Sequence, residues 1–560
     1  MNYYYLWFII LFISSIILFI IRIFLGYNNL VYFFEYNLYF FNSISICYLI
    51  YLDWISISFA SVVLFISSIV ILYRIQYIGW ISYSSIRFLF LVLLFVFRIF
   101  LIIIRPNLIS ILLGWDGLGL VSYCLVIYYN SIKRYLAGLI TCLTNRLGDV
   151  GLLISICWII SYGSWHFLFY PSFYSQDIYI LVVLSCFTKR AQIPFSCWLP
   201  AAIAAPTPVS ALVHSSTLVT AGVYLLIRFH SYLELNVYLI YIRLITIILS
   251  STCALFEYDL KKIIALSTLR QLGLIIISLF AGLTEISYFH LITHAIFKSL
   301  LFLCSGIFIY YINDNQDIRC IGFICVNLPF TTACFNISRL SLCGIPFLSG
   351  FYSKDLILES SLFNGINIYF FIFFYFSLGL TSGYSLRLFY YTIIRSRNLN
   401  SFYFINDEID YIKFSIFILT FFSVIIGCII IWLINFDLNF LLFPYYLKIL
   451  TLICVFLGIW FSFEILFFNY LFSIKFYLFN NYIWFIYRHS YYLYNMFYKI
   501  RLNSTNIVLG WGEYYGGTGL SFFLLKLSNY FQLYFSSSIK MFILIFILWI
   551  IILICLCSLI

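Results

Sequence analysis

Charged residues are scarce in this chain: Asp, Glu, Lys and Arg make up 9% of its 560 residues. Soluble domains carry about 25% charged residues, so this composition excludes an ordinary water-soluble globular protein. Hydrophobic residues instead account for 65% of the sequence, and the mean hydropathy is +1.08. The composition therefore indicates a chain that is surrounded mostly by lipid.

Cofactor-binding motifs are also lacking. Most of the 16 cysteines stand singly in apolar runs. The pairs Cys320/Cys325 and Cys555/Cys557 lack the four-ligand pattern of a zinc or iron–sulfur site. The glycines of residues 114–119 do not form a dinucleotide-binding fingerprint. We therefore predict that the chain binds no cofactor and no metal, so that any redox chemistry belongs to partner proteins.

No targeting segment is recognisable at the N-terminus. The first apolar run is too long for a secretory signal peptide and lacks a cleavage site, and no Arg/Ser-rich transit sequence is present. Phe (64) and Tyr (50) far outnumber Gly (26) and Pro (9), which indicates AT-rich codons as much as a lipid environment. These features predict a gene that is read inside an organelle and a product that is inserted there.

Apolar runs of about 20 residues, the length of a membrane span, recur along the chain. They predict an all-α polytopic membrane protein with about 15–16 transmembrane helices. The division of residues 329–394 is the least defined part of this prediction. The predicted spans lie near residues 5–25, 53–73, 86–105, 107–129, 136–162, 178–196, 206–228, 237–255, 263–281, 286–311, 329–348, 355–376, 378–394, 412–435, 447–469 and 541–560.

Ionisable residues nevertheless recur inside these spans, where a bare charge costs about 3 kcal/mol or more. His290, His294 and Lys298 follow an i, i+4, i+8 spacing and therefore form one stripe on a helix. Acids, bases and imidazoles that recur over at least five spans are typical of proton relays. The residues predicted to carry function are Asp116, Arg146, Asp149, Lys189, His214, His290, His294, Lys298, Lys354 and Asp355.

Each of these residues also has a structural alternative. A histidine within a span can bond to a neighbouring carbonyl, Asp116 can cap a helix, and Lys354 can extend its amine to the membrane surface. Arg146 and Asp149, three residues apart on one helical face, can simply neutralise each other. The relay interpretation therefore depends on the whole set rather than on one residue.

Two of the lysines lie near prolines that interrupt apolar sequence. Lys189 precedes Pro194 by five residues, and Lys354 follows Pro346 by eight. Proline removes a backbone donor and opens the helix, which makes room for a charge or for water. Two broken helices that carry a lysine on opposite sides of the break predict an inverted-repeat transporter.

Three segments carry a resemblance to a known family: Gly114-Trp-Asp-Gly-Leu-Gly-Leu-Val-Ser-Tyr-Cys124, Ala205-Pro-Thr-Pro-Val-Ser-Ala-Leu-Val-His-Ser215 and Gly350-Phe-Tyr-Ser-Lys-Asp355. The sequence resembles NADH–ubiquinone oxidoreductase chain 5, the distal antiporter-like subunit of respiratory complex I, especially its insect mitochondrial form. The likeness is dense from about residue 50 to 395 and looser on either side.

The resemblance implies a fold of two inverted five-helix antiporter-like repeats with broken helices, followed by a lateral amphipathic helix and a terminal anchor helix. The implied division is into N-terminal helices (1–106), a first antiporter-like half (107–255), a second half (256–395), C-terminal helices (396–469), a lateral segment (470–540) and an anchor (541–560). The glycines between residues 510 and 517 argue against one unbroken lateral helix.

The resemblance also implies residue roles. Asp116 matches the carboxylate that pairs with the lysine of the first broken helix, Lys189; the family often has Glu at this position. His214 matches the next station inward, and Lys354 the lysine of the second broken helix. The two sets that remain are the central axis, formed by His290, His294 and Lys298, and a charged pair near the first bundle, formed by Arg146 and Asp149.

The implied function is that of a core membrane-arm subunit of NADH:ubiquinone reductase (H⁺-translocating) in the mitochondrial inner membrane. FMN, iron–sulfur clusters and ubiquinone are expected on partner subunits, and the neighbouring antiporter-like subunit is the expected contact. Besides these subunits and the bilayer, no nucleic-acid partner is expected. Two alternatives stay open. A stand-alone cation/proton antiporter would work without a redox partner, and a structural spacer would tolerate the loss of Lys189 or Lys354.

Several arginines lie where charge has no obvious use. Arg98 and Arg105 have no acid nearby in sequence, and Arg190, Arg270 and Arg339 stand where the resembling family generally has serine. The chain also has only three methionines. Invertebrate mitochondria read AGA as serine and ATA as methionine, so we predict that several of these arginines are conceptual-translation artefacts. The formal net charge of +11 would then overstate the real charge.

Overall fold

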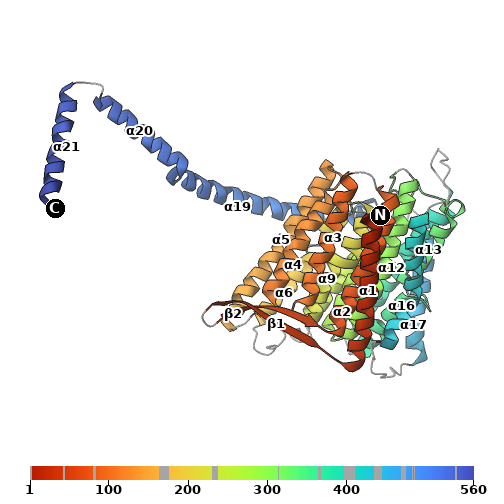
Figure 1. Cartoon of the computed structure of the whole chain (residues 1–560). Coiled ribbons are helices and arrows are strands. Elements are labelled where there is room, and N and C mark those ends of the chain that lie inside the picture. Colours follow the sequence, from red (N-terminus) through yellow and green to blue (C-terminus); the bar gives the residue numbers. More distant parts are fainter. Residues whose placement is uncertain are drawn as a thin grey trace. The chain divides into compact units, whose positions relative to one another are not determined.

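Helices dominate the fold, and most of them run side by side (Figure 1). By contacts the chain divides into two units, residues 1–486 and residues 487–560. The computed structural model describes residues 3–41, 44–79, 83–162, 165, 176–229, 237–312, 314–363, 368–396, 410–433, 444–467, 474–481, 483–484, 486–535 and 539–559.

Within these ranges, 13 helices are long and apolar enough to cross a membrane, which confirms a polytopic α-helical membrane protein. The helices of the first half of the chain are α1 (Tyr3–Asn28), α2 (Trp54–Tyr77), α3 (Tyr83–Ile104), α4 (Leu108–Val126), α5 (Ile132–Ile159), η1 (Ile160–Tyr162), α6 (Gln176–Lys189), α7 (Trp198–Ala202), α8 (Thr207–Val209), η3 (Ser210–Thr217), α9 (Leu218–Arg228) and α10 (Val237–Phe256). Those that follow in the first unit are α11 (Leu260–Phe280), α12 (Thr284–Tyr311), η5 (Ile324–Val326), α13 (Pro329–Cys343), α14 (Ser349–Phe363), α15 (Ile368–Phe389), η6 (Tyr390–Ile394), α16 (Asp410–Leu433), α17 (Tyr445–Phe467) and α18 (Ile474–Asn481).

Three of the sixteen predicted spans are shorter helices, because each adjoins a break. α6 has 14 residues, and α13 and α14 have 15 each. The prediction that one span ends and another begins near residue 377 is wrong, since α15 runs continuously through that position. The helices on either side, α14 and α15, are instead separated by the sequence Asn-Gly-Ile-Asn at 364–367, which lies outside the described residues. Asn and Gly favour turns, and the long apolar run after them obscured the boundary.

A β-hairpin connects α1 to α2, and the count of apolar spans does not reveal it. Strands β1 (Tyr32–Phe41) and β2 (Ile44–Leu52) pair antiparallel, with an irregularity between Asn37 and Tyr39. Both strands are rich in aromatic and β-branched residues, which favour extended backbone. Figure 1 shows the hairpin as a long ribbon at one end of the helices of the first unit.

A buried ion pair ties the start of α2 to the end of α9. The Asp53 carboxylate caps α2 by accepting a hydrogen bond from the Ser56 backbone N–H at 2.8 Å. The same carboxylate accepts two hydrogen bonds from the Arg228 guanidinium, at 2.5 and 2.6 Å. Burial raises the pKa of the Asp53 carboxyl, but the charge of Arg228 and its hydrogen bonds outweigh that effect, so the pKa lies below its ordinary value.

Replacement of Arg228 by methionine should destabilise the protein strongly, because it leaves a buried carboxylate without a counter-charge. We expect a loss of about 3–5 kcal/mol at neutral pH, measured by thermal unfolding in detergent. Asp53 stabilises the fold above its unfolded-state pKa, and this contribution is lost as pH falls through the lower folded-state pKa. The difference between the two proteins should therefore shrink in acid.

The matched control is Arg319→Met. Arg319 pairs with Asp317 at 2.6 Å on the surface, and an exposed pair contributes about 1 kcal/mol or less. Equal losses for the two variants, or a loss for Arg228→Met that does not change with pH, would contradict this account of the Asp53–Arg228 pair.

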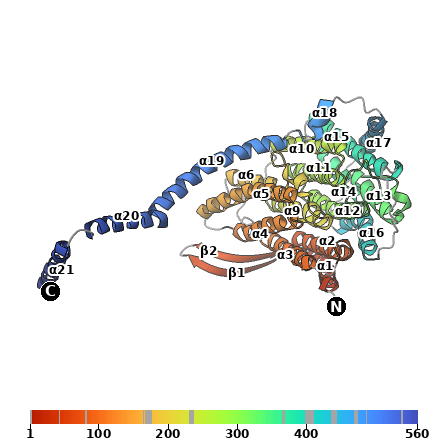
Figure 2. The same cartoon turned by 90° about the horizontal axis from the view of Figure 1, so that it is seen from above.

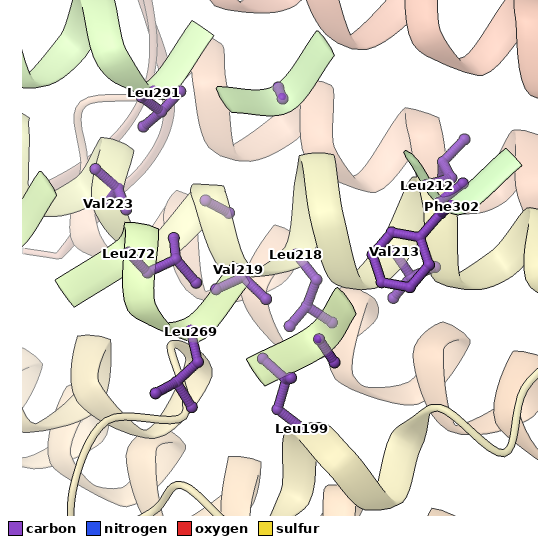
Figure 3. Close-up of a cluster of buried hydrophobic side chains, with 14 of the residues drawn as sticks. Leu199, Leu212, Val213, Leu218, Val219, Val223, Leu269, Leu272, Leu291 and Phe302 are labelled. Atoms are coloured by element: carbon purple, nitrogen blue, oxygen red, sulfur yellow. The ribbon is translucent and has the colours of Figure 1, made fainter. Parts of the chain in front are cut away.

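α12 lies at the centre of the first unit and packs against α11, α13, α14, α16 and η3, as the view from above shows (Figure 2). An apolar cluster with members on α7, η3, α9, α11 and α12 lies at its contacts with the neighbouring elements, and Figure 3 shows side chains of this cluster. The labelled members, all buried, are Leu199, Leu212, Val213, Leu218, Val219, Val223, Leu269, Leu272, Leu291 and Phe302.

The second unit comprises three helices: most of α19 (Ile486–Tyr515), α20 (Gly517–Phe535) and α21 (Ile539–Leu559). α19 and α20 are separated at Gly516, so the prediction that residues 510–517 interrupt a single lateral helix is confirmed. α21 has the length and hydropathy of a membrane span, and none of the residues in its apolar window is buried. This unit therefore offers an extended and largely exposed surface.

Candidate functional site

The first broken helix places a lysine at its end. α6 ends at Lys189, helix does not resume until α7, and Ala191 between them has a φ of +54°. The predicted break before Pro194 is therefore confirmed. The Trp198 indole N–H donates to the Thr188 carbonyl at 2.7 Å and so satisfies one of the last carbonyls of α6.

The Lys189 ammonium is buried against α4. Its Nζ donates to the Trp115 carbonyl at 3.1 Å and lies 4.9 Å from the centre of the Trp115 ring. These contacts give the ammonium one carbonyl and one aromatic face in place of water. The sequence motif around Asp116 therefore contributes Trp115, the residue before Asp116, to the site of Lys189.

Asp116 is in ion-pair contact with an arginine of α5. Arg146 on α5 lies between two carboxylates, with its Nη1 3.7 Å from Asp116 Oδ2 and 3.5 Å from Asp149 Oδ2. No ion pair joins Asp116 directly to Lys189 among the described residues. Among the described residues the ion-pair contact of Asp116 is with Arg146, and the charge of Asp116 also acts on Lys189.

A close approach of α5 and α6 brings this cluster to the broken helix. A Cβ at Gly148 would collide with the Thr188 side chain and lie 3.1 Å from the Ser185 carbonyl. Only glycine permits this helix spacing. The position lies between Arg146 and Asp149, so the same contact that requires glycine holds the charged pair beside the end of α6.

A π-helical segment, η3, follows the next proline-rich turn. Such segments are rare and are often found at functional sites, because the wider turn leaves backbone groups and side chains in unusual positions. His214, predicted as the next station of the relay, lies on this segment. The His214 side chain is outside the described residues.

The predicted stripe on α12 is confirmed as a row of buried polar side chains. His290 Nδ1 lies 2.9 Å from the Ser353 hydroxyl on α14, and its Nε2 lies 3.3 Å from Gln271 Oε1 on α11. The Thr293 hydroxyl lies 3.0 Å from the same Ser353 hydroxyl. Ser353 directly precedes Lys354 in the sequence, so its hydrogen bonds link α12 to the part of α14 that carries Lys354.

The other two members of the stripe continue along α12. Lys298 Nζ donates to the Ser267 hydroxyl on α11 at 2.5 Å. The rings of His290 and His294 have centroids 6.4 Å apart, and neither His294 nitrogen has a protein partner in the part of the chain that the structure describes. A buried imidazole without a protein partner is a position where a water molecule can complete a hydrogen-bonded chain.

The second broken helix holds its lysine in a different way. α13 ends at Cys343 and α14 begins at Ser349, so the break predicted at Pro346 is confirmed. Lys354 Nζ donates to the Cys343 carbonyl at 3.0 Å. The carbonyls at the end of a helix lack backbone donors and carry partial negative charge, so they accommodate an ammonium.

Glycine is required at the end of α13. Gly344 has a φ of +84° and its N–H bonds to the Leu340 carbonyl, as is common where a helix ends. Its missing Cβ would lie 3.3 Å from the Lys354 side chain. The same glycine thus ends the helix and lets the lysine reach the exposed carbonyls. Lys354 and Asp355 both line a small cavity on this side of α14.

Sequence reasoning identified the charged residues but missed their uncharged partners. Ser267, Gln271 and Ser353 hold the α12 stripe, and Trp115 holds Lys189. Ser353 could have been found from its place beside Lys354 in the predicted motif. Ser267 and Gln271 could not, because their pairing with α12 depends on how α11 packs.

Two of the arginines that are predicted to be translation artefacts have buried guanidinium groups without hydrogen-bond partners among the described residues. Arg190 and Arg270 are fully buried, and no nitrogen of either guanidinium has a hydrogen-bond partner within the described ranges. The Arg270 charge lies close enough to act on His290, Lys298 and Lys354. By contrast, the other suspected arginines each donate to at least one oxygen: Arg98 to the Leu113 carbonyl, Arg105 to the Tyr48 hydroxyl and Arg339 to the Ser385 carbonyl.

Candidate metal ligands do not gather in the described part of the chain. No group of three or more His, Cys, Asp or Glu side chains there is placed to hold a metal ion. The described site itself offers lysines, imidazoles, hydroxyls and carboxylates, which bind and release protons.

Two broken helices flanking a buried polar helix define a membrane protein with an antiporter-like fold. Residues 106–381 match the family described as NADH:quinone oxidoreductase/Mrp antiporter, TM, and residues 384–557 match NADH dehydrogenase subunit 5 C-terminus. A chain of the Mrp complex from Dietzia sp. DQ12-45-1b has a similar structure, with a TM-score of 0.70 and 19% identity. The match covers 89% of this chain and 57% of that one.

Similar sequences cover almost the whole chain. NADH-ubiquinone oxidoreductase chain 5 of Locusta migratoria is 47% identical over 98% of both chains. The chain 5 of Aedes aegypti is 45% identical over 98% of this chain and 97% of its own. The chain therefore belongs to the NADH-ubiquinone oxidoreductase chain 5 family, as the sequence resemblance predicted.

Proposed function

We propose that this chain is a proton-translocating membrane-arm subunit of respiratory complex I, driven by electron transfer from NADH to ubiquinone in other subunits. The observation that carries the proposal is the buried polar row on α12, with Lys298 bonded to Ser267 and His290 bonded to Ser353 beside Lys354. Burial of ionisable groups within a membrane is costly, and proteins that retain them generally use them for transport.

In the proposed mechanism, protons pass along three buried lysines. Lys189 receives a proton near the charged cluster of Asp116, Arg146 and Asp149, Lys298 relays it along α12, and Lys354 releases it. Because a carboxylate favours the ammonium form of a nearby lysine, any movement of Arg146 between its two acids changes the proton affinity of Lys189. His214 is proposed as the station between Lys189 and α12.

A neighbouring membrane subunit is the proposed partner of α5. The Arg146 and Asp116 side chains are 48% and 38% exposed, although they lie within helices that span the membrane. Lipid does not solvate such charges, so this surface calls for contact with a protein or with water. The matches to chain 5 of other species favour the neighbouring antiporter-like subunit of the same complex, and the exposed helices of the second unit would offer further contacts.

The proposed location is the mitochondrial inner membrane, with the redox cofactors held on other subunits. Two competing functions remain testable. A stand-alone antiporter shares the same buried axis but needs no redox partner, and a structural spacer needs neither the lysines nor the histidines. The exposed charges of Asp116 on α4 and Arg146 on α5 favour an assembled subunit over the stand-alone antiporter.

Native-gel separation of membrane complexes, with staining for NADH dehydrogenase activity, tests the proposed assembly. We expect peptides of this chain in the active band. Recovery of the chain only in bands without NADH activity would overturn the complex I assignment, and sodium–proton exchange would then be the activity to measure. A chain in the active band whose lysines can be lost without effect on pumping would be a spacer.

A further inference from the structure

The end of α6, where Lys189 lies, forms a helix-ending motif in which glycine is usual. The Gln192 backbone N–H donates to the Phe187 carbonyl at 3.2 Å. The Ala191 N–H donates to the Thr188 carbonyl at 3.3 Å, and Ala191 has a left-handed φ of +54°. These features together are those of a Schellman motif. Because alanine has a Cβ, this backbone conformation is strained and depends on surrounding contacts to hold it.

The Gln192 side chain supplies such a contact. The residue at this place in the motif usually packs an apolar side chain against its own helix. Gln192 is instead fully buried as a polar amide, and its Oε1 accepts a hydrogen bond from the Thr246 hydroxyl on α10 at 2.9 Å. Arg243 Nη1 lies 3.3 Å from the same oxygen. A buried amide is costly unless it is bonded, so this contact is a built connection between the end of α6 and α10.

Thr246 also lies against α11, the helix that holds the polar row of α12. α10 and α11 pack along each other, and the Thr246 hydroxyl is 3.2 Å from the point that a Cβ at Gly273 would occupy. Gln271, two residues before Gly273, has its Oε1 3.3 Å from His290 Nε2 on α12. The contact at Thr246 therefore ties the first broken helix to the helix that positions the row on α12.

Two buried polar atoms in the same break have no protein partner. They are the Gln192 amide nitrogen and the Ser196 hydroxyl, neither of which has a hydrogen-bond partner among the described residues. Buried groups of this kind are generally satisfied by water molecules. One end of the Gln192 amide is thus fixed to α10, and the other is left to hold water beside the end of α6.

We propose that Gln192 is a positioning residue for proton transfer. Through Thr246 it holds Lys189 at a fixed place relative to α10 and α11, and this placement lets Lys189 pass its proton on toward α12. Gln192 does not take up the proton itself, because its amide only donates and accepts hydrogen bonds. The proposal rests on the proposed function, since it assumes that Lys189 carries protons.

Thr246→Val tests the positioning role, because valine keeps the branched shape of threonine but lacks the hydroxyl. In complex I that contains the variant chain, assembled in sealed vesicles, we expect the proton flux through this subunit to fall by about 10²-fold, as small displacements of reacting groups can cause. The number of protons released per NADH oxidised should fall nearly as far as in Lys189→Met. Thr246→Ser, which keeps a hydroxyl, should retain most of the ratio.

The matched control is Thr252→Val on the same helix. The Thr252 hydroxyl donates to carbonyls of α10 itself, those of Ile248 and Leu249, both at 3.0 Å. This variant should leave the ratio of protons to NADH unchanged. An equal loss in Thr252→Val, or a loss that is just as large in Thr246→Ser, would show that altered packing of α10 is the cause and would overturn the proposal.

Gln192→Met removes the other partner and keeps the length of the side chain, so it should lower the ratio as Thr246→Val does. If Lys189→Met lowers the ratio but Gln192→Met or Thr246→Val does not, the positioning role is overturned and the proposed function stands. If none of the three has an effect, both are overturned. Each variant is first checked for assembly on a native gel, and if one of the two partner variants fails to assemble, the other decides.

Discussion

Peptides from the native protein are expected to contain serine rather than arginine at positions 190 and 270. The structure strengthens this prediction for these two positions, because both guanidinium groups are fully buried and without hydrogen-bond partners. An uncompensated buried charge costs several kcal/mol. At position 270 the cost is increased by three neighbouring basic groups on α12 and α14.

Mass spectrometry of peptides from the purified native complex tests the two positions. Arg228, which is largely buried, and Arg387, which is buried, are the matched controls because both are well bonded, Arg228 to Asp53 and Arg387 to the Glu257 carbonyl. We expect arginine at both control positions. Arginine at 190 and 270 in native peptides would contradict the prediction, and buried anions or waters would then have to satisfy these groups.

The outcome also decides the charge of the relay. With serine at 270, the neighbourhood of Lys298 and Lys354 loses a fixed positive charge, which would otherwise oppose the arrival of a proton at either lysine. Serine at 190 likewise removes a charge next to Lys189. The relay proposed above is therefore better suited to serine than to arginine at these two positions.

Lys298→Met should abolish proton translocation through this subunit. Lys298 is fully buried, and within the described residues its ammonium donates to the Ser267 hydroxyl, so its replacement removes the ionisable group at that position. A positioned proton-transfer group contributes about 10²–10⁴-fold to a rate, and we expect a loss of proton flux through this subunit within that range. Methionine fits the space and avoids a buried charge, so assembly should be preserved.

The matched control for this variant is Lys262→Met. Lys262 lies on α11, as Ser267 does, but its ammonium pairs with Asp259 at 2.5 Å and is 43% exposed. Its loss should leave translocation unchanged. Comparable losses in the two variants would show that the effect comes from altered packing or surface charge rather than from the relay.

The sequence predicts the α12 stripe well because helical periodicity is local. Spacings of four residues between His290, His294 and Lys298 are enough to place them on one face, and the structure confirms that this face is buried, with His290 and Lys298 hydrogen-bonded. The two helix breaks are equally local, since proline and glycine act on their own backbone. Their positions after Lys189 and before Lys354 are both confirmed.

What the sequence does not predict depends on packing between distant segments. The contact of Asp116 with Arg146 joins α4 to α5 across 30 positions of the sequence and is an example. The hairpin at residues 32–52 was not recognised, because its aromatic strands have the same apolar character as the helices around them.

The most direct test of the lysine relay is the number of protons released per NADH oxidised by sealed vesicles that contain the native complex or the Lys298→Met variant. The account predicts a smaller ratio for the variant, while NADH oxidation continues when an ionophore removes the proton gradient. An unchanged ratio in a fully assembled variant complex would contradict the account, because protons would then cross the membrane without Lys298.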